Sequence, residues 1–165
     1  MYIKDEFPPL LAAGFHRKSE AEVEELCVAR FPLSVTRKGI MAGLHTILKK
    51  IVAVGITGEI WLDGSFVTEK IDPSDSDFVA MIPAEFHDAG TEEQRAVIEW
   101  LISKENEPKK SFKCDAYVHL KYPEGSPEHH LWLPTLNHWQ DIYGHSVKTR
   151  EPKGIVVLDL EKGLL

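Results

Sequence analysis

Residues 61–83 (WLDGSFVTEKIDPSDSDFVAMIP) contain the side chains whose types and spacing best suit chemistry. An apolar strand is expected to run into Gly64 and Ser65, nine residues follow, and Asp75 and Asp77 then open a second apolar strand. Because residues i and i+2 of a strand share one face about 6.5–7 Å apart, we predict that both carboxylates point the same way. Carboxylate oxygens are the ligands that Mg²⁺ and Mn²⁺ prefer, so the pattern predicts a metal site.

A third carboxylate is expected from the segment 111–120. This segment alternates apolar and polar residues as a half-buried strand does, and the alternation puts Asp115 on the face opposite to its apolar side chains. If this strand lies beside the strand that begins at Asp77, the carboxylates of Asp75, Asp77 and Asp115 meet at one edge of the sheet.

Four residues are candidates for binding phosphate. Gly64 lacks a Cβ where a backbone must come close, and Ser65 starts a helical turn whose N–H groups can hold phosphate oxygens. Lys70 has the reach to touch a triphosphate, although an exposed loop lysine is more often a solvated charge. Lys153 belongs to a basic cluster, residues 148–153, that is either a solvated loop or a second wall of the carboxylate site.

Helices and strands must position these side chains, and the sequence pattern predicts both. Ser19 and Glu22 form a capping box that starts a short helix ending near Arg30. Apolar residues recur with helical spacing over 35–54, and Thr91 begins a further helix that reaches residue 104. Strands are expected at residues 59–62, 77–82, 111–120 and 154–160. This order predicts an α+β (or α/β) fold, a sheet with helices packed on it.

The length of 165 residues fits a single domain over 1–165. Within it we expect an N-terminal arm and short helix (1–34), a core (35–120), and an irregular, proline-containing segment followed by a final strand (121–165). Helical spacing of Leu136, Trp139 and Tyr143 is the only regular signal in the irregular part. Trp139 is expected to be a packing residue more often than a ligand contact.

Charge and cysteine content exclude several classes of protein. Nineteen basic and 26 acidic residues give a net charge of −7, which disfavours general binding to nucleic acids or anionic membranes. The two cysteines, Cys27 and Cys114, are too few and too far apart for a disulfide framework or a structural zinc site, so both are expected to be buried apolar residues. The sequence pattern predicts neither a membrane-spanning stretch nor a secretory signal, and we expect a cytoplasmic protein.

Simpler interpretations compete with the metal site. Asp, Pro and Ser are typical turn residues, so the segment DPSDSD taken alone is a hydrophilic turn. An EF-hand is excluded, because no start in this segment has both a sixth-position glycine and a final glutamate. The eight histidines show no HExxH motif or paired helical spacing.

Taken together, these residues resemble a known signature: Gly64-Ser65, nine residues, Asp75-x-Asp77 followed by apolar residues, and a lone Asp115 on a later strand. This is the pattern of the DNA polymerase beta-like nucleotidyltransferase superfamily, and especially of its minimal nucleotidyltransferases. The rest of the chain, including LAAGFHRKSEAEVEELCVARFP and IYGHSVKTREPKGIVVLDL, is similar to a little-characterised group of small bacterial nucleotidyltransferase-like proteins.

The resemblance implies a nucleotidyltransferase-like mixed β-sheet and a residue-level mechanism. Asp75 and Asp77 would bind the Mg²⁺ (or Mn²⁺) of a nucleoside triphosphate, Asp115 would complete the catalytic metal's shell, and Gly64 and Ser65 would hold the outer phosphates. The expected reaction transfers a nucleoside monophosphate, AMP from ATP first of all, to a hydroxyl of a protein or RNA acceptor. No long helical recognition domain is present, so a docked partner protein is expected, and a tRNA acceptor stays open.

A second hypothesis comes from a different class of function. The same fold, catalytically weak or inactive, would act by docking, for example as the antitoxin-like partner of a toxin. Labelling with nucleoside triphosphates and Mg²⁺ separates the two hypotheses.

Overall fold

The computed structural model describes residues 5–161, and within them five strands form one mixed sheet in the order β1–β5–β2–β3–β4. The strands are β1 (Gly14–Arg17), β2 (Gly58–Asp63), β3 (Ser76–Pro83), β4 (Cys114–Lys121) and β5 (Gly154–Leu160). β1 pairs with β5, and β3 with β4, in parallel; β2 is antiparallel to both of its neighbours, β5 and β3. The α+β fold in a single domain is therefore confirmed.

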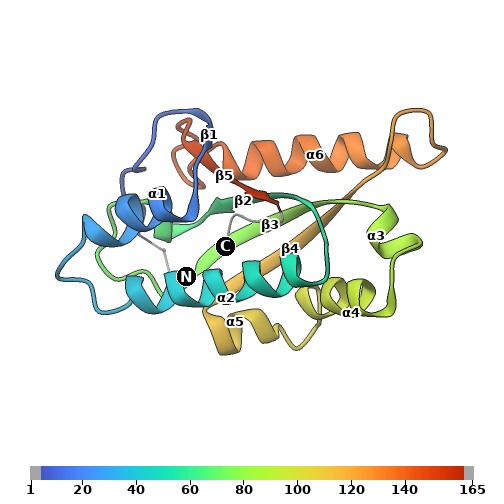
Figure 1. The fold of residues 1–165 in the computed structure, drawn as a ribbon. Helices are drawn as coiled ribbons and strands as arrows, with labels where there is room; N and C mark the ends of the chain where they lie inside the picture. Colours follow the sequence, from blue (N-terminus) through green and yellow to red (C-terminus); the bar gives the residue numbers. More distant parts are fainter. Residues whose placement is uncertain (1–4, 162–165) are drawn as a thin grey trace.

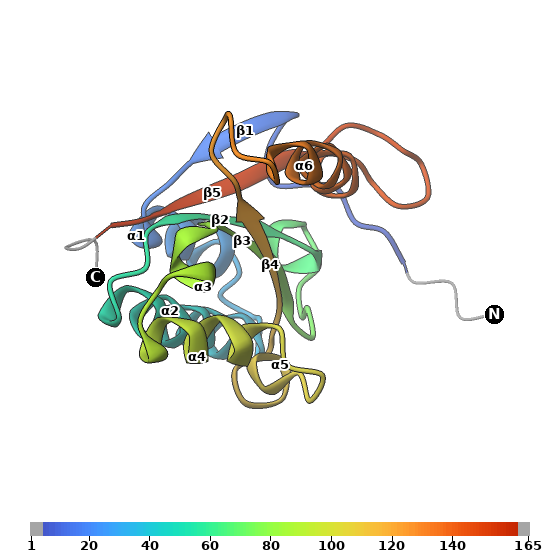
Figure 2. The same cartoon turned by 90° about the vertical axis from the view of Figure 1, so that its right-hand side faces the viewer.

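Helices cover the two faces of this sheet unequally (Figures 1 and 2). Most of them, among them α2, α4 and α5, lie on one face, and α6 lies alone on the other. The helices are α1 (Glu20–Glu24), the π-helix η1 (Glu25–Ala29), α2 (Arg37–Ala53), the 3₁₀ turn η2 (Ser65–Val67), α3 (Glu85–Asp88), α4 (Glu92–Leu101), α5 (Glu107–Phe112) and α6 (His129–Tyr143). We call the first face the closed face and the second the α6 face.

The closed face is a continuous apolar core. The stripe of α2, with Ile40, Leu44 and Ile47 at helical spacing, is fully buried in one apolar cluster with alternate residues of β3, among them Phe78 and Ile82. Each such side chain contributes about 1.5–3 kcal/mol by burial, so this packing dominates the stability of the domain. Cys27 and Cys114 are buried in the same core as free thiols, as predicted.

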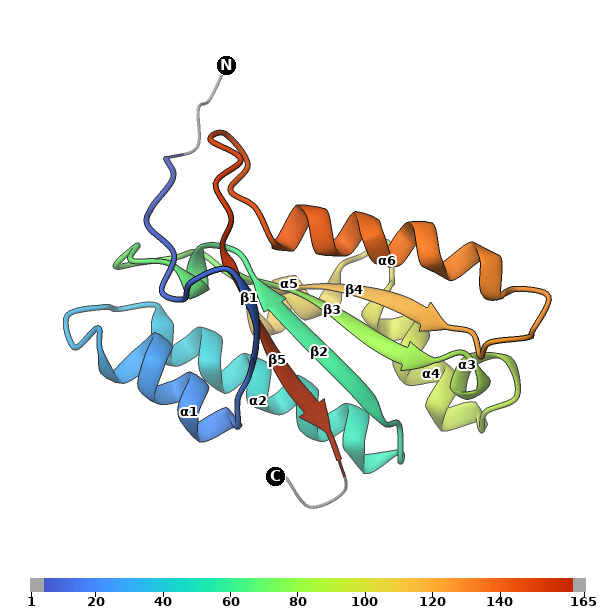
Figure 3. The ribbon, with the colours of Figure 1, turned by 90° about the horizontal axis from the view of Figure 1, so that it is seen from above.

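The α6 face has a smaller core. Val79 and Met81 of β3 and Ile155 and Val157 of β5 contact the α6 side chain Tyr143, and further partly buried side chains of α6 pack beside them. Figure 3 shows α6 running over the sheet, with the loop after α6 next to the N-terminal arm at one end.

Most of the predicted elements are confirmed with small changes of boundary. Ser19 and Glu22 do form the capping box of α1, and Thr91 and Gln94 form another at the start of α4, which ends earlier than predicted. The long helix over 37–53 and the strand over 154–160 are confirmed, and Gly55 after α2 has a φ of 78°, as a helix-terminating glycine should.

Two predictions about local structure were wrong. The strand expected from Ser111 begins only at Cys114, because residues 107–112 form the helix α5, bounded by left-handed Asn106 and Lys113. The segment expected to be irregular contains the 15-residue helix α6. Pro134 lies inside this helix, which packing of one apolar side on the sheet stabilises despite the missing N–H group.

Within residues 5–161 the structure contains no helix with the length and apolar character needed to cross a membrane.

Candidate functional site

Three aspartates form a row across neighbouring strands on the α6 face. Asp63 pairs with Asp77 across β2 and β3, and Asp77 pairs with Asp115 across β3 and β4. β3 and β4 are parallel and begin at the same end of the sheet, which is also where the antiparallel β2 ends. The topology therefore brings the three residues together at this end. The predicted placement of Asp115 on the same face as Asp77 is thus what the structure has. Asp63 was not predicted, although its position directly before Gly64 was a signal.

Gly64 touches this row closely. Its φ is 82°, and a Cβ built on it would lie 2.0 Å from Oδ2 of Asp77. Any other residue would collide with the Asp77 carboxylate and would adopt a backbone conformation that side chains disfavour. Ser65 then begins the short turn η2, as predicted.

Lys109 lies between two carboxylates, that of Asp115 in the row and that of Asp75 just before β3. Nζ of Lys109 is 2.7 Å from Oδ2 of Asp115 and 3.1 Å from Oδ2 of Asp75. The second oxygen of each carboxylate also accepts a hydrogen bond, from Asn106 Nδ2 at 3.1 Å for Asp115 and from Ser74 Oγ at 3.1 Å for Asp75. The hydrogen bond to Asp115 raises the pKa of Lys109 above its ordinary value; partial burial opposes this rise and Asp75 adds to it. The ammonium is therefore charged at all physiological pH values.

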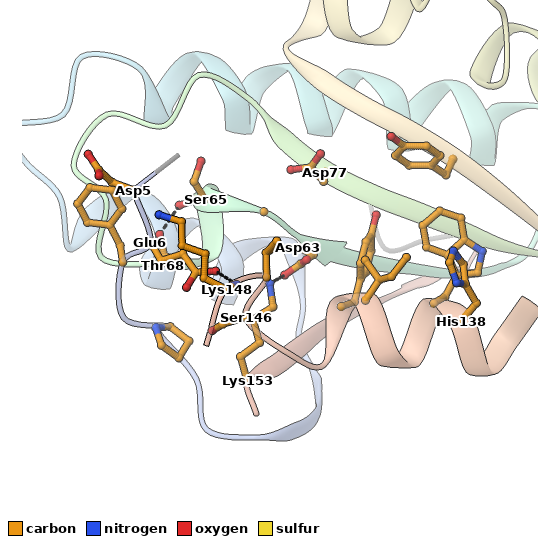
Figure 4. Close-up of a pocket in the computed structure, with 18 residues that line it drawn as sticks. Asp5, Glu6, Asp63, Ser65, Thr68, Asp77, His138, Ser146, Lys148 and Lys153 are labelled. Atoms are coloured by element: carbon orange, nitrogen blue, oxygen red, sulfur yellow. Dashed lines mark hydrogen bonds and ion pairs between the residues drawn. The ribbon is translucent and has the colours of Figure 1, made fainter. Parts of the chain in front are cut away.

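Asp63 has its own counter-ion. Oδ1 of Asp63 is 2.6 Å from Nζ of Lys153, and both side chains are about nine-tenths buried. Figure 4 shows the two side chains facing each other beneath Asp77. Burial raises the pKa of Asp63, and the ammonium of Lys153 together with the N–H of Gly64 opposes that rise. Lys153, predicted to bind phosphate, is therefore already engaged by a carboxylate of the site.

A cavity of about 710 Å³ opens at this row and extends under α6. Gly64, Ser65, Asp63 and Asp77 lie at one end. The other end is aromatic: the Trp139 ring is 5.1 Å from that of Tyr117 and 5.4 Å from that of Tyr143, measured between centroids.

The aromatic end carries two buried polar atoms. The Tyr143 hydroxyl and the Trp139 Nε1 have no hydrogen-bond partner among the described residues. Tyr143 is 3% exposed, and burial, with the nearby Asp63 as the next cause, raises the pKa of its hydroxyl far above the ordinary value, so the group is a proton donor. Buried donors without acceptors are uncommon in folded proteins, and those at a cavity wall suit a ligand that brings acceptors.

The N-terminal arm and the loop after α6 border the cavity. The backbone N–H of Lys148 donates to Oε1 of Glu6 at 2.7 Å, and residues of both segments line the cavity. Figure 4 shows these two side chains close together at the end away from His138. Two segments far apart in sequence thus share this wall and are joined by a backbone-to-carboxylate hydrogen bond.

Arg37, which sequence reasoning missed, shapes the turn between Gly64 and the Asp75 segment. The residue is fully buried at the start of α2, and its ring neighbour Phe31 lies 3.7 Å from the guanidinium carbon. Its N–H groups donate to five backbone carbonyls, those of Cys27, Phe66, Thr68, Lys70 and Ile71. Four of these carbonyls belong to the loop and the fifth, that of Cys27, to η1, so the guanidinium fixes the loop and ties it to that helix.

The predicted site residues therefore lie in two different environments. Gly64, Ser65, Asp77 and Lys153 line the cavity, whereas Asp75 and Asp115 do not and are held by Lys109. Lys70 lies outside the cavity lining, with its ammonium 5.9 Å from the centre of the Phe7 ring. Within the described part of the chain, no group of three or more His, Cys, Asp or Glu side chains is arranged to hold a metal ion.

The chain belongs to the family of unknown function DUF6932, whose family model matches residues 5–159. Neither the search of curated proteins nor the search of solved structures found a match.

Proposed function

We propose that this member of the DUF6932 family is a metal-dependent nucleotidyltransferase that transfers a nucleoside monophosphate, with ATP as the expected donor, to a hydroxyl of a protein or RNA acceptor. One observation carries the proposal: Asp77 and Asp115 are register partners on one face of the sheet, and Gly64 lies against Asp77 in the lining of the cavity. Asp77, Asp115 and Gly64 belong to the sequence signature, and their proximity supports the proposal.

The residues fit a divalent cation that arrives with the nucleotide. Asp77 offers hard carboxylate oxygens, and the missing Cβ of Gly64 leaves room beside them. Mg²⁺ is commonly held by one or two carboxylates together with substrate phosphates and waters, so a cage of three protein ligands is not required. When bound, the ion would neutralise charge on the phosphates during transfer.

The cavity suits the rest of the nucleotide. With phosphates at Gly64 and Ser65, the nucleoside would extend under α6 towards Tyr117 and Trp139, whose rings offer apolar faces. Acceptor atoms of the base or ribose would meet the Tyr143 hydroxyl. Lys148 lines the same cavity and adds positive charge near its mouth.

The proposed transfer forms one bond and breaks one. The acceptor oxygen bonds to the α-phosphorus, the bond from that phosphorus to its bridging oxygen breaks, and pyrophosphate leaves with the electron pair. The hydroxyl proton passes to solvent. The protein contributes position and charge rather than covalent chemistry.

The test is transfer of label from α-³²P nucleoside triphosphates with Mg²⁺, using the protein alone, with bulk RNA, and with the product of the neighbouring gene. We expect labelling in at least one arm, a loss of at least about 100-fold in Asp77→Asn, and a similar loss in Gly64→Ala. Gly39→Ala is the matched control, because a Cβ at Gly39 meets nothing within 4 Å. Absence of both labelling and nucleotide binding in the wild-type protein under every condition would reject the proposal.

Docking without turnover is the second candidate, and one observation favours it. α6 exposes two large apolar side chains that do not line the cavity, Leu131 at 57% and Leu133 at 44%. In this version a partner protein, such as a toxin for which this chain acts as antitoxin, covers the outer side of α6. Binding of the neighbouring gene's product that survives Asp77→Asn but not Leu131→Asp, without any labelling, would favour docking over transfer.

We place either function in the cytoplasm. The buried thiols of Cys27 and Cys114 are unpaired, which suits a reducing compartment, and nucleoside triphosphates are abundant there.

A further inference from the structure

Lys109 has the position that a cation would take between Asp75 and Asp115. Its ammonium contacts one oxygen of each carboxylate, at 3.1 and 2.7 Å, and protein donors occupy the other two oxygens. The two carboxylates are mostly buried, with 14% and 16% of their side chains exposed. A divalent ion bound by these oxygens would come close to the ammonium and would be repelled by it.

The fold holds Lys109 at this place. α5 packs tightly on α2: a Cβ on Gly43 would lie 2.0 Å from the backbone oxygen of Phe112. Left-handed residues stand at both ends of α5, and one of them, Asn106, also donates to Asp115. The lysine is therefore carried by a helix with a fixed position rather than by a loose loop.

Neither carboxylate of this pair lines the cavity. Asp63 and Asp77 line it, but Asp75, Asp115 and Lys109 do not. A nucleotide in the cavity would therefore meet the Asp77 side of the row first.

We propose that Lys109 prevents divalent cations from binding between Asp75 and Asp115, because its ammonium occupies the place where a second metal ion would otherwise bind. The inference deepens the proposed function, on which it rests for the role of the cation at Asp77. It replaces the expectation that Asp75 binds the metal ion of the nucleotide and that Asp115 completes the shell of the catalytic metal.

The test is titration of the full chain with Mn²⁺ alone, followed by electron paramagnetic resonance of the free ion. Wild-type protein is expected to show no tight site at Asp75 and Asp115. Lys109→Met removes the ammonium and should create one site per chain, with binding at least about tenfold tighter than in the wild type. Lys109→Gln should behave in the same way, and Lys109→Arg should resemble the wild type.

Lys110→Met is the matched control, because Lys110 is the next residue of α5, is also exposed, and changes the net charge equally. The new site in Lys109→Met should disappear in the double variant with Asp115→Asn. Circular dichroism checks that each variant is folded.

Equal Mn²⁺ binding by the wild type, Lys109→Met and Lys110→Met would overturn the inference. A tight wild-type site that Asp115→Asn removes would also overturn it. If Lys109→Met gains its site while no condition yields labelling from nucleoside triphosphates, the inference stands and the proposed transfer reaction is rejected.

Discussion

The two faces of the sheet are built from the same strands but differ in what they bury. On the closed face, side chains such as Phe78 and Leu62 pack into an apolar core under several helices. On the α6 face, their direct neighbours in sequence, Asp77 and Asp63, lie beside a cavity under a single helix. Alternation along a strand allows one segment to serve both purposes, because consecutive side chains point to opposite faces.

The difference shows where stability and chemistry are separated in this molecule. The closed face contains mostly apolar side chains that need no partner. The α6 face contains ion pairs at Lys109 and Lys153 and two buried donors, Tyr143 and Trp139, without acceptors. Substitutions on the closed face should therefore change stability, and substitutions on the α6 face should mainly change binding.

The largest loss of stability is expected on substituting Arg37, whose buried guanidinium holds the turn that follows Gly64. Arg37→Met leaves five backbone carbonyls without their donors, so we expect a loss of about 3–5 kcal/mol in the free energy of unfolding. Urea denaturation measures it. Lys38→Met, at an exposed neighbouring position, should change stability by less than about 0.5 kcal/mol. Similar values for the two variants would contradict the role given to Arg37.

A pair of core truncations compares the two faces directly. Ile47→Ala, on the closed face, should cost about 2–5 kcal/mol, since Ile47 is fully buried among packed neighbours. Leu136→Ala, on α6, should cost less than about 1.5 kcal/mol, because Leu136 is only partly buried beside the smaller core. The same denaturation experiment reports both values. An equal or larger loss for Leu136→Ala would remove the energetic distinction between the faces.

Tyr143→Phe should separate stability from binding. The Tyr143 hydroxyl is buried without a partner, so its removal is expected to leave stability unchanged or to raise it by up to about 1 kcal/mol. The same variant should bind a non-hydrolysable ATP analogue about three- to tenfold more weakly, as calorimetry would measure. A clear loss of stability would mean that the hydroxyl has a partner in solution.

The smallest effect concerns Asp72, which holds the start of α2 at the surface. Its Oδ1 accepts from the Val35 N–H at 2.8 Å and from the Ser34 hydroxyl at 2.9 Å, and these bonds, the former first, lower the pKa of Asp72. The stabilisation is present above the unfolded-state pKa of about 4 and is lost as the pH falls through the lower folded-state pKa.

Asp72→Asn lacks the carboxylate and should therefore be slightly less stable than the wild type at neutral pH, and the two stability curves should converge as the pH falls below about 4. Thermal unfolding at a series of pH values checks this. Parallel curves for the two proteins throughout the acid range would refute the assignment.

Sequence reasoning succeeded where local signals and burial agree. The capping box at Ser19, the apolar period of α2 and the alternation of β3 each depend on neighbouring residues only, and each was found. It failed at α5, and in α6 it found only the helical spacing of Leu136, Trp139 and Tyr143 in the second half of the helix. In α5 the residues before Cys114 continue the alternation of the strand by chance, and in α6 the proline masked a helix that packing on the sheet stabilises.

The same limit applies to the candidate site. Asp77, Asp115 and Gly64 were named from spacing and alternation, and the structure places them together. Asp63 was missed although it directly precedes Gly64, and Arg37 was missed because nothing local distinguishes a buried arginine from an exposed one. Lys109 was missed because its two partners are brought to it by strand pairing and by the docking of α5.

The amino-acid sequence alone determined the alternating strands, the long amphipathic helix and the side of each strand on which the acidic residues project, since these follow from backbone periodicity. Only the tertiary structure decided which cations face those acids. Strand order and helix docking bring Lys109 to Asp115 and Asp75, 6 and 34 residues away along the chain, and Lys153 to Asp63, 90 residues away. Pairings that depend on tertiary structure in this way leave no local pattern in the sequence.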